Sequence, residues 1–220
     1  VARIDVHGLH YLGSERVLRT AGLEVGQDLF RVDFARARQR LLLEPRIAAV
    51  HFSRMWPRGI EINVEERTAV LLVQHGVPWE LDSAGVLLPP LADGVEADAP
   101  LVVGPNFDRW PAGSRVRTTD VARALAWVRA LSDRDLQLGG QLSEVDVTDA
   151  RCTGLTLMSG TRVLSSAWPP GRRTLSALRV VLADLRQRGT QAQEVDMRFE
   201  AQIIVRPVSP TPGGVGAGSS

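Results

Sequence analysis

Apolar and polar residues alternate most clearly in residues 50–65. Val50, Phe52 and Trp56 alternate with polar or small neighbours, and residues 60–65 continue the alternation with apolar side chains at even positions. Between the two runs, Pro57-Arg58-Gly59 supplies a fixed φ and then a residue that tolerates φ > 0, as a tight turn requires. This pattern predicts a β-hairpin with one buried face and one solvated face.

The residues before this hairpin are punctuated by helix and strand signals. Gly8 ends a first alternating run, Ser14 stands where a helix N-cap belongs, and Gly22 follows the apolar face as a stop. Asp33 caps a second helical pattern, which Pro45 terminates. The order strand, helix, helix, strand, strand in residues 1–68 predicts a three-stranded sheet covered on one face by two helices.

The pattern in the second half of the chain predicts a separate domain. Thr118 or Thr119 caps a helical pattern through residue 131, and a final helical pattern stops at Gly189. Val195, Met197 and Phe199 then alternate, and residues 203–205 complete a long C-terminal strand. Residues 69–207 therefore predict an antiparallel β-sheet with helices on one side, an α+β fold overall. The Pro, Gly and Ser-rich residues 208–220 predict a disordered tail.

Composition argues for a folded domain pair without a strong electrostatic field. The 220 residues carry 26 basic side chains, all arginine, against 25 acidic ones, for a net charge of +1. Nucleic acid is therefore not an expected partner. The single cysteine, Cys152, excludes an internal disulfide and metal sites of the CxxC type. No stretch reaches the ~18 apolar residues of a membrane span. Because Val1 leads directly into the strand pattern, we expect a fragment of a longer protein.

No arrangement of residues predicts catalysis. Glu65 and Glu66 are adjacent in a strand and so point to opposite faces, and Ser159-Gly160 lacks the strand–turn–helix context of a nucleophile elbow. His7 and His10 have no neighbouring carboxylate to complete a metal site. We therefore expect no catalytic residue, no metal and no cofactor. Binding becomes the leading class of function.

Several motifs occur in an order that resembles a known family. The motifs are Val6-His7-Gly8-Leu9, Ala21-Gly22-Leu23, Gly26-Gln27-Asp28-Leu29-Phe30-Arg31-Val32-Asp33, Arg54…Trp56-Pro57…Val64-Glu65-Glu66-Arg67, Leu81-Asp82-Ser83-Ala84-Gly85 and Val195-Asp196-Met197-Arg198-Phe199. Their order resembles the extracytoplasmic part of the bacterial cell-division family FtsQ (DivIB). That resemblance implies a POTRA domain in residues 1–68, a C-terminal β domain in residues 69–207 and the tail in residues 208–220.

The resemblance also implies a function. Proteins of this family are non-enzymatic scaffolds of the division machinery, or divisome. They hold the extracytoplasmic parts of FtsB and its partner FtsL, and through them reach the septal peptidoglycan synthase FtsW with FtsI. A cytoplasmic tail and one membrane-spanning helix precede the POTRA domain, so the resemblance implies a single-pass inner-membrane protein with its bulk in the periplasm, at the septum. That helix would be absent from this sequence.

The candidate partner site lies in the last strand, which as the last in the chain is expected at a sheet edge. The resemblance implies that contact positions run through Phe199, Glu200, Ala201, Gln202, Ile203, Ile204 and Val205. Arg172 and Arg173, at a helix start, are candidates for pairing with acids on the partner. For Phe199, Ile203 and Ile204, ordinary core packing stays open as an alternative. The run from Gln202 to Ile204 is also more apolar than the small-residue run associated with this strand.

A second reading belongs to transport assembly. POTRA domains also occur in outer-membrane barrel insertases and two-partner secretion proteins, where they bind unfolded strands by edge addition. Those proteins usually carry several POTRA copies or a barrel, whereas this sequence shows one copy and no run of alternating barrel strands. A third reading, a wall hydrolase, rests on no positive feature.

Overall fold

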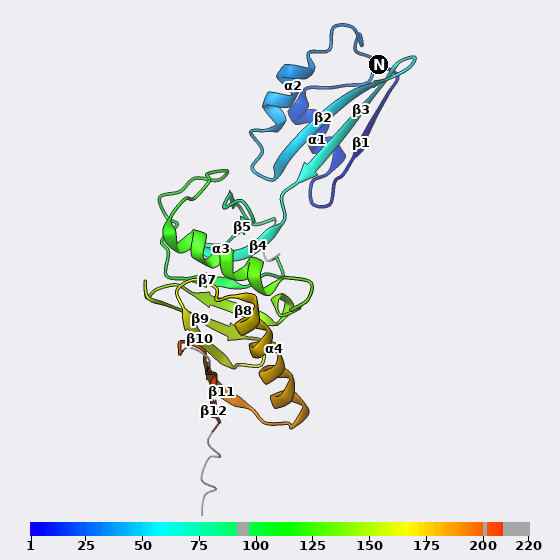
Figure 1. The fold of residues 1–220 in the computed structure, drawn as a ribbon. Helices are drawn as coiled ribbons and strands as arrows, with labels where there is room; N and C mark the ends of the chain where they lie inside the picture. The colour runs from blue at the N-terminus through cyan, green and yellow to red at the C-terminus, as the bar shows by residue number, and fades with distance from the viewer. Residues whose placement is uncertain (92–96, 200–201, 209–220) are drawn as a thin grey trace, which may run out of the picture. The chain divides into compact units, whose positions relative to one another are not determined.

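The computed structural model of the protein describes residues 1–91, 97–199 and 202–208. The chain divides into two compact units, Val1–Leu125 and Ala126–Ser220. Figure 1 shows the elements along the chain, with the N-terminal module in blue and cyan. The predicted boundary between residues 68 and 69 lies inside the first unit and stays a prediction. The predicted disordered tail falls outside the described residues from position 209 onward.

The N-terminal module has the predicted order of strand, helix, helix, strand, strand. Its elements are β1 (Arg3–His7), α1 (Ser14–Ala21), α2 (Phe34–Leu41), β2 (Ile47–Met55) and β3 (Gly59–Glu66). β3 lies in the centre of the sheet, antiparallel to β2 and parallel to β1. Gly8 ends β1 at φ 81°, where a Cβ would lie 2.0 Å from the Val64 carbonyl oxygen. Only glycine fits this close approach.

The helix ends follow the sequence signals with one exception. Asp33 caps α2 by accepting a hydrogen bond from the Arg36 backbone N–H at 2.9 Å, and Gly22 ends α1 in the left-handed conformation. Ser14, however, is the first helical residue and Gly13 occupies the N-cap without a side-chain bond. The prediction that Ser14 caps α1 is therefore wrong, because the chain enters the helix one residue earlier. The faces of α1 and α2 that carry Val17, Ala21, Ala37 and Leu41 are buried against the sheet residues Val50, Ile60 and Ile62.

The rest of the first unit contributes strands of mixed direction. Its strands are β4 (Ala69–His75), β5 (Val77–Asp82), β6 (Leu87–Leu88) and β7 (Leu101–Val103). β4 and β5 form a hairpin around Gly76, β6 pairs antiparallel with β5, and β7 runs parallel to β4. Helix α3 (Thr119–Leu131) follows, and the Thr118 hydroxyl accepts a hydrogen bond from Val121 N–H at its start.

In the second unit, the described residues form strands in the order β8-β9-β10-β11-β12. Its elements are the 3₁₀ turn η1 (Gly139–Gln141), β8 (Leu142–Asp146), β9 (Cys152–Leu157), β10 (Arg162–Ser166), α4 (Arg172–Gln187), β11 (Ala192–Asp196) and β12 (Ile204–Pro207). β8, β9 and β10 are antiparallel neighbours, and β11 and β12 form a second antiparallel pair. Leu175, Leu178 and Leu182 form the buried face of α4.

Two sequence predictions need correction. The α+β class is confirmed, but β10 runs parallel to β11 and β4 parallel to β7, so the strands of residues 69–207 are not all antiparallel as predicted. Between β10 and β11 the reason is α4, which carries the chain back so that it re-enters the sheet in the same direction. The predicted long C-terminal strand is two strands, because the chain leaves the sheet after β11 and returns antiparallel as β12.

A buried ion pair joins the N-terminal module to β5 within the first unit. Arg46 Nη1 lies 2.6 Å from Glu80 Oε2, and both side chains are at most 5% exposed. Arg46 Nη2 also donates to the Pro89 carbonyl at 3.0 Å, while Glu80 Oε1 has no partner among the described residues. Arg67 adds a second link through Asp82 at 2.8 Å. Both pairs cross the predicted boundary between residues 68 and 69.

We expect Arg46→Met to lower the free energy of unfolding in urea by about 3–5 kcal/mol, because it leaves the Glu80 carboxylate buried without its charge partner. Arg16→Met is the matched control, since Arg16 pairs with Glu44 on the surface and its loss should cost less than about 1 kcal/mol. Equal losses in the two variants would show that the Arg46–Glu80 pair does not hold the module in place.

Candidate functional site

The last strand of the chain forms an edge of its sheet. β12 pairs with β11 on one side, in the register Val195 with Val205 and Asp196 with Ile204, and no described strand lies on the other side. The predicted edge position is therefore confirmed for residues 204–207. An edge strand presents unpaired backbone groups that a strand from another chain can pair with.

The hydrogen bonding of β12 shows which residue faces outward. Val208 N–H donates inward to the Gln191 carbonyl at 3.0 Å. Because the N–H groups of successive strand residues alternate in direction, those of Arg206 and Ile204 also point toward β11, and that of Val205 points away. Pro207 shares the outward direction but has no N–H to donate. Val205 is thus the residue within β12 that offers both an outward N–H and an outward carbonyl.

The turn that leads from β11 toward β12 is held by an ion pair. The Asp196 side chain is 2% exposed and lies within hydrogen-bonding distance of Arg198 at both carboxylate oxygens. Its Oδ1 accepts from the Arg198 backbone N–H at 3.0 Å and from Nε at 2.9 Å, and its Oδ2 accepts from Nη2 at 2.7 Å. The side-chain hydrogen bonds from Arg198 lower the pKa of Asp196 below its ordinary value, against the opposing effect of burial.

A cleft of about 700 Å³ opens beside this turn. It is lined by the end of β10, the first turns of α4 and the segment after β11, with Ser166, Pro170, Arg173, Thr174, Ala177, Met197, Arg198, Phe199, Gln202 and Ile203. The fold therefore brings four of the predicted site residues into one cleft: Arg173, Phe199, Gln202 and Ile203. Phe199 is 52% exposed and Ile204 is 40% exposed. These exposed fractions exclude core packing, the alternative interpretation, for Phe199 and Ile204.

The two candidate arginines differ in their surroundings. Arg172 forms ion pairs with Asp133 and Asp135 and does not line the cleft. Arg173 lines the cleft, is exposed, and forms no ion pair with any described residue. Of the remaining predicted positions, Glu200 and Ala201 lie outside the described residues.

Sequence reasoning missed the residues that shape the cleft from α4 and β10. Ala177 follows Arg173 by four residues and so shares its side of α4, which made helical periodicity a usable signal for Ala177 but not for Thr174, the residue next to Arg173. Ser166 is the last residue of β10 and Pro170 lies in the loop before α4, so helical periodicity gives no signal for either. The Asp196-Met197-Arg198 spacing was visible, but its role as a turn-holding ion pair was not inferred.

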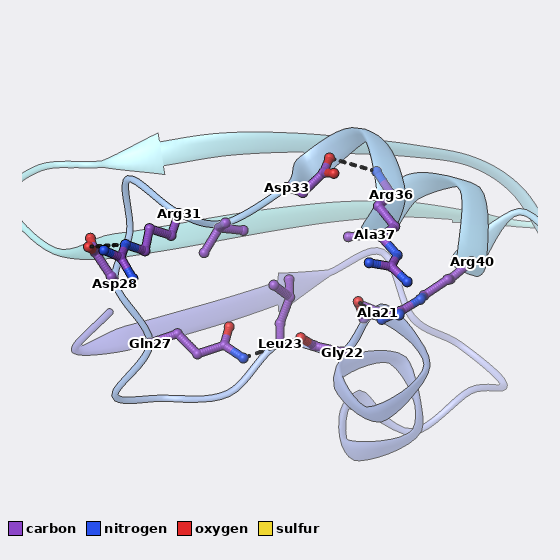
Figure 2. A pocket seen from close by; sticks show the side chains of 11 residues that line it. Ala21, Gly22, Leu23, Gln27, Asp28, Arg31, Asp33, Arg36, Ala37 and Arg40 are labelled. Atoms are coloured by element: carbon purple, nitrogen blue, oxygen red, sulfur yellow. Dashed lines mark hydrogen bonds and ion pairs between the residues drawn. The ribbon is translucent and has the colours of Figure 1, made fainter.

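A second cleft, of about 410 Å³, lies in the N-terminal module between the end of α1 and the start of α2. Arg31, Arg36 and Arg40 line it, and Figure 2 shows the Arg36 and Arg40 side chains directed toward the end of α1. Asp28 lies 3.7 Å from Arg31 Nε, and Asp33 is engaged as the cap of α2. Neither Arg36 nor Arg40 has an acidic partner in the part of the chain that the structure describes. The cleft is therefore basic on one side.

Comparison with known proteins defines the class of the N-terminal module. Residues 1–67 match the family model described as "POTRA domain, FtsQ-type". The strand and helix order observed in this module agrees with that match, so the chain is a POTRA-domain protein.

The similarity extends beyond this domain. The chain is 25% identical over 208 residues to "Cell division protein FtsQ" of Syntrophotalea carbinolica, covering 94% of this chain and 73% of that protein. It is 24% identical over 211 residues to the protein of the same name from Geotalea daltonii, covering 94% and 75%. Over 89 residues it is 42% identical to that of Streptomyces coelicolor, covering 38% and 33%. Residues 1–67 thus carry an FtsQ-type POTRA domain, and most of the chain is similar to cell-division proteins named FtsQ.

Two other features are absent from the described ranges. No helix there is both long enough and apolar enough to cross a bilayer. Residues 1–91, 97–199 and 202–208 also contain no group of His, Cys, Asp and Glu side chains that is placed to hold a metal ion.

The Asp196–Arg198 pair predicts a pH dependence of stability. Because the pKa of Asp196 is lowered in the folded protein, its carboxylate stabilises the fold above the ordinary value of 3.8 and loses this effect as the pH falls through the folded value. We expect the difference in unfolding free energy between wild type and Asp196→Asn to be constant from neutral pH to about pH 5 and to shrink below about pH 4.

The control variant is Asp184→Asn, which removes an exposed acid that pairs with Arg188 across one helical turn. Its effect in urea unfolding at neutral pH should stay near 0.3–0.5 kcal/mol, roughly the contribution of such helix pairs. A difference for Asp196→Asn that is independent of pH would contradict the assigned role of the ion pair.

Proposed function

We propose that this protein is a non-enzymatic scaffold of the divisome that binds extracytoplasmic segments of FtsB, paired with FtsL, at the edge of β12 and the adjoining cleft. The observation that carries this proposal is the outward backbone of Val205 on β12, an edge strand with no described strand on its outer side. A cleft lined by Phe199 and Arg173 lies next to it. Through FtsB and FtsL the scaffold connects to the synthase FtsW with FtsI and controls when septal peptidoglycan is made. The protein acts at the inner membrane of the septum, with these domains in the periplasm.

Backbone pairing gives the register of the complex. A partner strand that adds to β12 accepts a hydrogen bond from Val205 N–H and donates one to the Val205 carbonyl, which fixes its position along the edge. Pro207 offers no further N–H, so donor pairing ends there. The edge is short, and a single added strand of this length buries less than the ~1,600 Å² of a standard interface. Additional contacts are therefore required for stable binding.

The cleft supplies those contacts. Phe199 is half exposed at its rim and offers an aromatic side chain that becomes buried when a partner segment covers it. Arg173 is free of internal ion pairs among the described residues, so its guanidinium is available to a carboxylate on the partner in a bidentate arrangement. Arg172 is already engaged with Asp133 and Asp135 and links the start of α4 to the loop after α3 instead.

The FtsQ-type match and the similarity over most of the chain favour this scaffold over a role in outer-membrane protein assembly. A transport role would also use strand addition, but it has no support from any other described feature.

The sharpest test removes one backbone hydrogen-bond donor from the exposed edge of β12. Val205→Pro deletes the outward N–H and places the proline ring where the partner strand approaches, while every inward hydrogen bond of β12 is kept. We expect the dissociation constant for the soluble segment of FtsB with FtsL, measured by calorimetry, to rise about tenfold or more.

Val205→Ala is the matched control, since it shortens the same side chain and keeps the N–H. It should bind within about threefold of wild type, because the side chain of Val205 is only partly buried. Circular dichroism and thermal unfolding must show that both variants fold. Unaltered binding by a folded Val205→Pro protein would move the partner site away from β12, and absence of binding by wild type would remove the scaffold proposal.

A further inference from the structure

Three large apolar side chains stand exposed on the POTRA domain near residue 1. Trp56 is 87% exposed, Phe30 is 80% exposed and Val25 is 65% exposed. Apolar contacts were available nearby, since Phe34 and Phe52 stack at 5.3 Å and Arg54 lies 4.9 Å above the Phe34 ring. Trp56 and Phe30 nevertheless remain outside this cluster. Exposed aromatic residues concentrated in one region indicate an interaction surface.

Backbone hydrogen bonds show that the three side chains belong to one end of the domain. Gly26 N–H donates to the Val1 carbonyl at 2.8 Å, which holds the loop carrying Val25 and Phe30 against the start of β1. Ala2 N–H donates to the Arg58 carbonyl at 2.7 Å, which holds the turn carrying Trp56 against the same residues. Figure 1 shows the N-terminus, this loop and the β2–β3 turn at the same end of the three-stranded sheet.

Arginine residues lie in the same loop and turn as the exposed apolar side chains. Arg58 lies in the β2–β3 turn beside Trp56, and Arg31 follows Phe30 in the loop. Arg31 and Arg36 line the basic cleft of about 410 Å³, shown in Figure 2, into which Arg40 also extends. Arg36 and Arg40 lie four residues apart on α2, where like charges repel each other, and among the described residues no acid compensates them. An anion in this cleft relieves that repulsion.

We propose that this end of the POTRA domain docks on an anionic lipid surface. Trp56, Phe30 and Val25 enter the interface between headgroups and acyl chains, where amphipathic and aromatic side chains are favoured. Arg58, Arg31 and Arg36 bind headgroup phosphate oxygens, which the planar guanidinium contacts with two parallel hydrogen bonds. The negative surface potential of anionic lipids adds long-range attraction for each of these charges.

The shape of this end favours lipid over protein as the occupant. Val25 and Phe30 lie in one loop and Trp56 in a separate turn, so the apolar groups come from two segments and not from the face of one helix or strand. A fluid interface takes up separate side chains without a preformed complementary shape, whereas a protein partner needs matching pockets for them. This contact is distinct from the binding of FtsB at β12, because it uses a different domain and different chemistry.

Sedimentation with large unilamellar vesicles tests the proposal. The chain is mixed with vesicles of phosphatidylcholine alone and with vesicles of phosphatidylcholine and phosphatidylglycerol in equal parts, at low and at high salt. We expect binding to the anionic vesicles, weaker binding to the zwitterionic ones, and loss at high salt as phosphate contacts are screened. Tryptophan emission should shift to shorter wavelength on binding, and this shift should be absent in Trp56→Phe.

Two sets of variants separate the apolar and charged contributions. Trp56→Ser with Phe30→Ser should lower the partition coefficient at least about tenfold on anionic vesicles. Arg31→Gln with Arg36→Gln should lower binding to the level seen on zwitterionic vesicles. Val180→Ser and Arg151→Gln are matched controls, since they remove an exposed apolar side chain and an exposed charge elsewhere and should leave binding unchanged.

Inorganic phosphate distinguishes a lipid headgroup from a free anion. Phosphate should reduce vesicle binding no more than sodium chloride of the same ionic strength does. Absence of vesicle binding by the folded chain would overturn the proposal and favour a protein partner at this end. Vesicle binding that is unchanged in both sets of variants would also overturn the proposal. Phosphate binding in the cleft without vesicle binding would do the same. Val205→Pro should bind vesicles like wild type, so failure here and failure at β12 are distinguishable.

Discussion

The ion pair between Asp196 and Arg198 determines the arrangement of the candidate partner site. A carboxylate that is 2% exposed must be fully paired, and Arg198 provides three hydrogen bonds to it from one residue, through its backbone N–H and both arms of its guanidinium. These bonds end β11 and redirect the chain, so that the following residues form a wall of the cleft before returning as β12. Without this turn, residues 195–207 would be free to continue as a single strand, with no cleft beside it.

The position of the edge follows from the connection through α4. Because the helix returns the chain parallel to β10, β11 is added beside β10 on the side away from β9, and β12 in turn becomes the outermost described strand. The same connection places the first turn of α4, with Arg173, next to the segment after β11. Backbone, aromatic and basic groups suited to one partner segment thus lie together, although they come from positions between Arg173 and Val205 in the chain.

Local patterns predicted the local parts of this structure. The hairpin of β2 and β3, the cap of α2 at Asp33 and the end of α1 at Gly22 follow from signals within a few residues, and all are present. The alternation of Val195, Met197 and Phe199 predicted one long strand, which is wrong. The ion pair of Asp196 with Arg198 turns the chain there, although the apolar alternation continues to Phe199. Pairs such as Arg46 with Glu80, 34 residues apart, leave no local pattern at all. Their identification required the fold.

In the candidate site, too, some features follow from local sequence patterns and others depend on the fold. Phe199, Ile204 and the edge position were accessible from the order of elements, and Arg173 from its place at a helix start. The difference between Arg172 and Arg173 was not, since it depends on Asp133 and Asp135 approaching from another loop. The outward direction of Val205 was also out of reach, because it is set by the hydrogen bond between Val208 and Gln191.

The most direct measurement of the central claim is amide hydrogen exchange at Val205, resolved by NMR, with and without the soluble segment of FtsB and FtsL. In the free protein this N–H points to solvent and should exchange rapidly, while that of Arg206, which points toward β11, is protected. Addition of the partner should slow exchange at Val205 and leave the protection of Arg206 in place. Saturating binding with unchanged, rapid exchange at Val205 would contradict strand addition at β12.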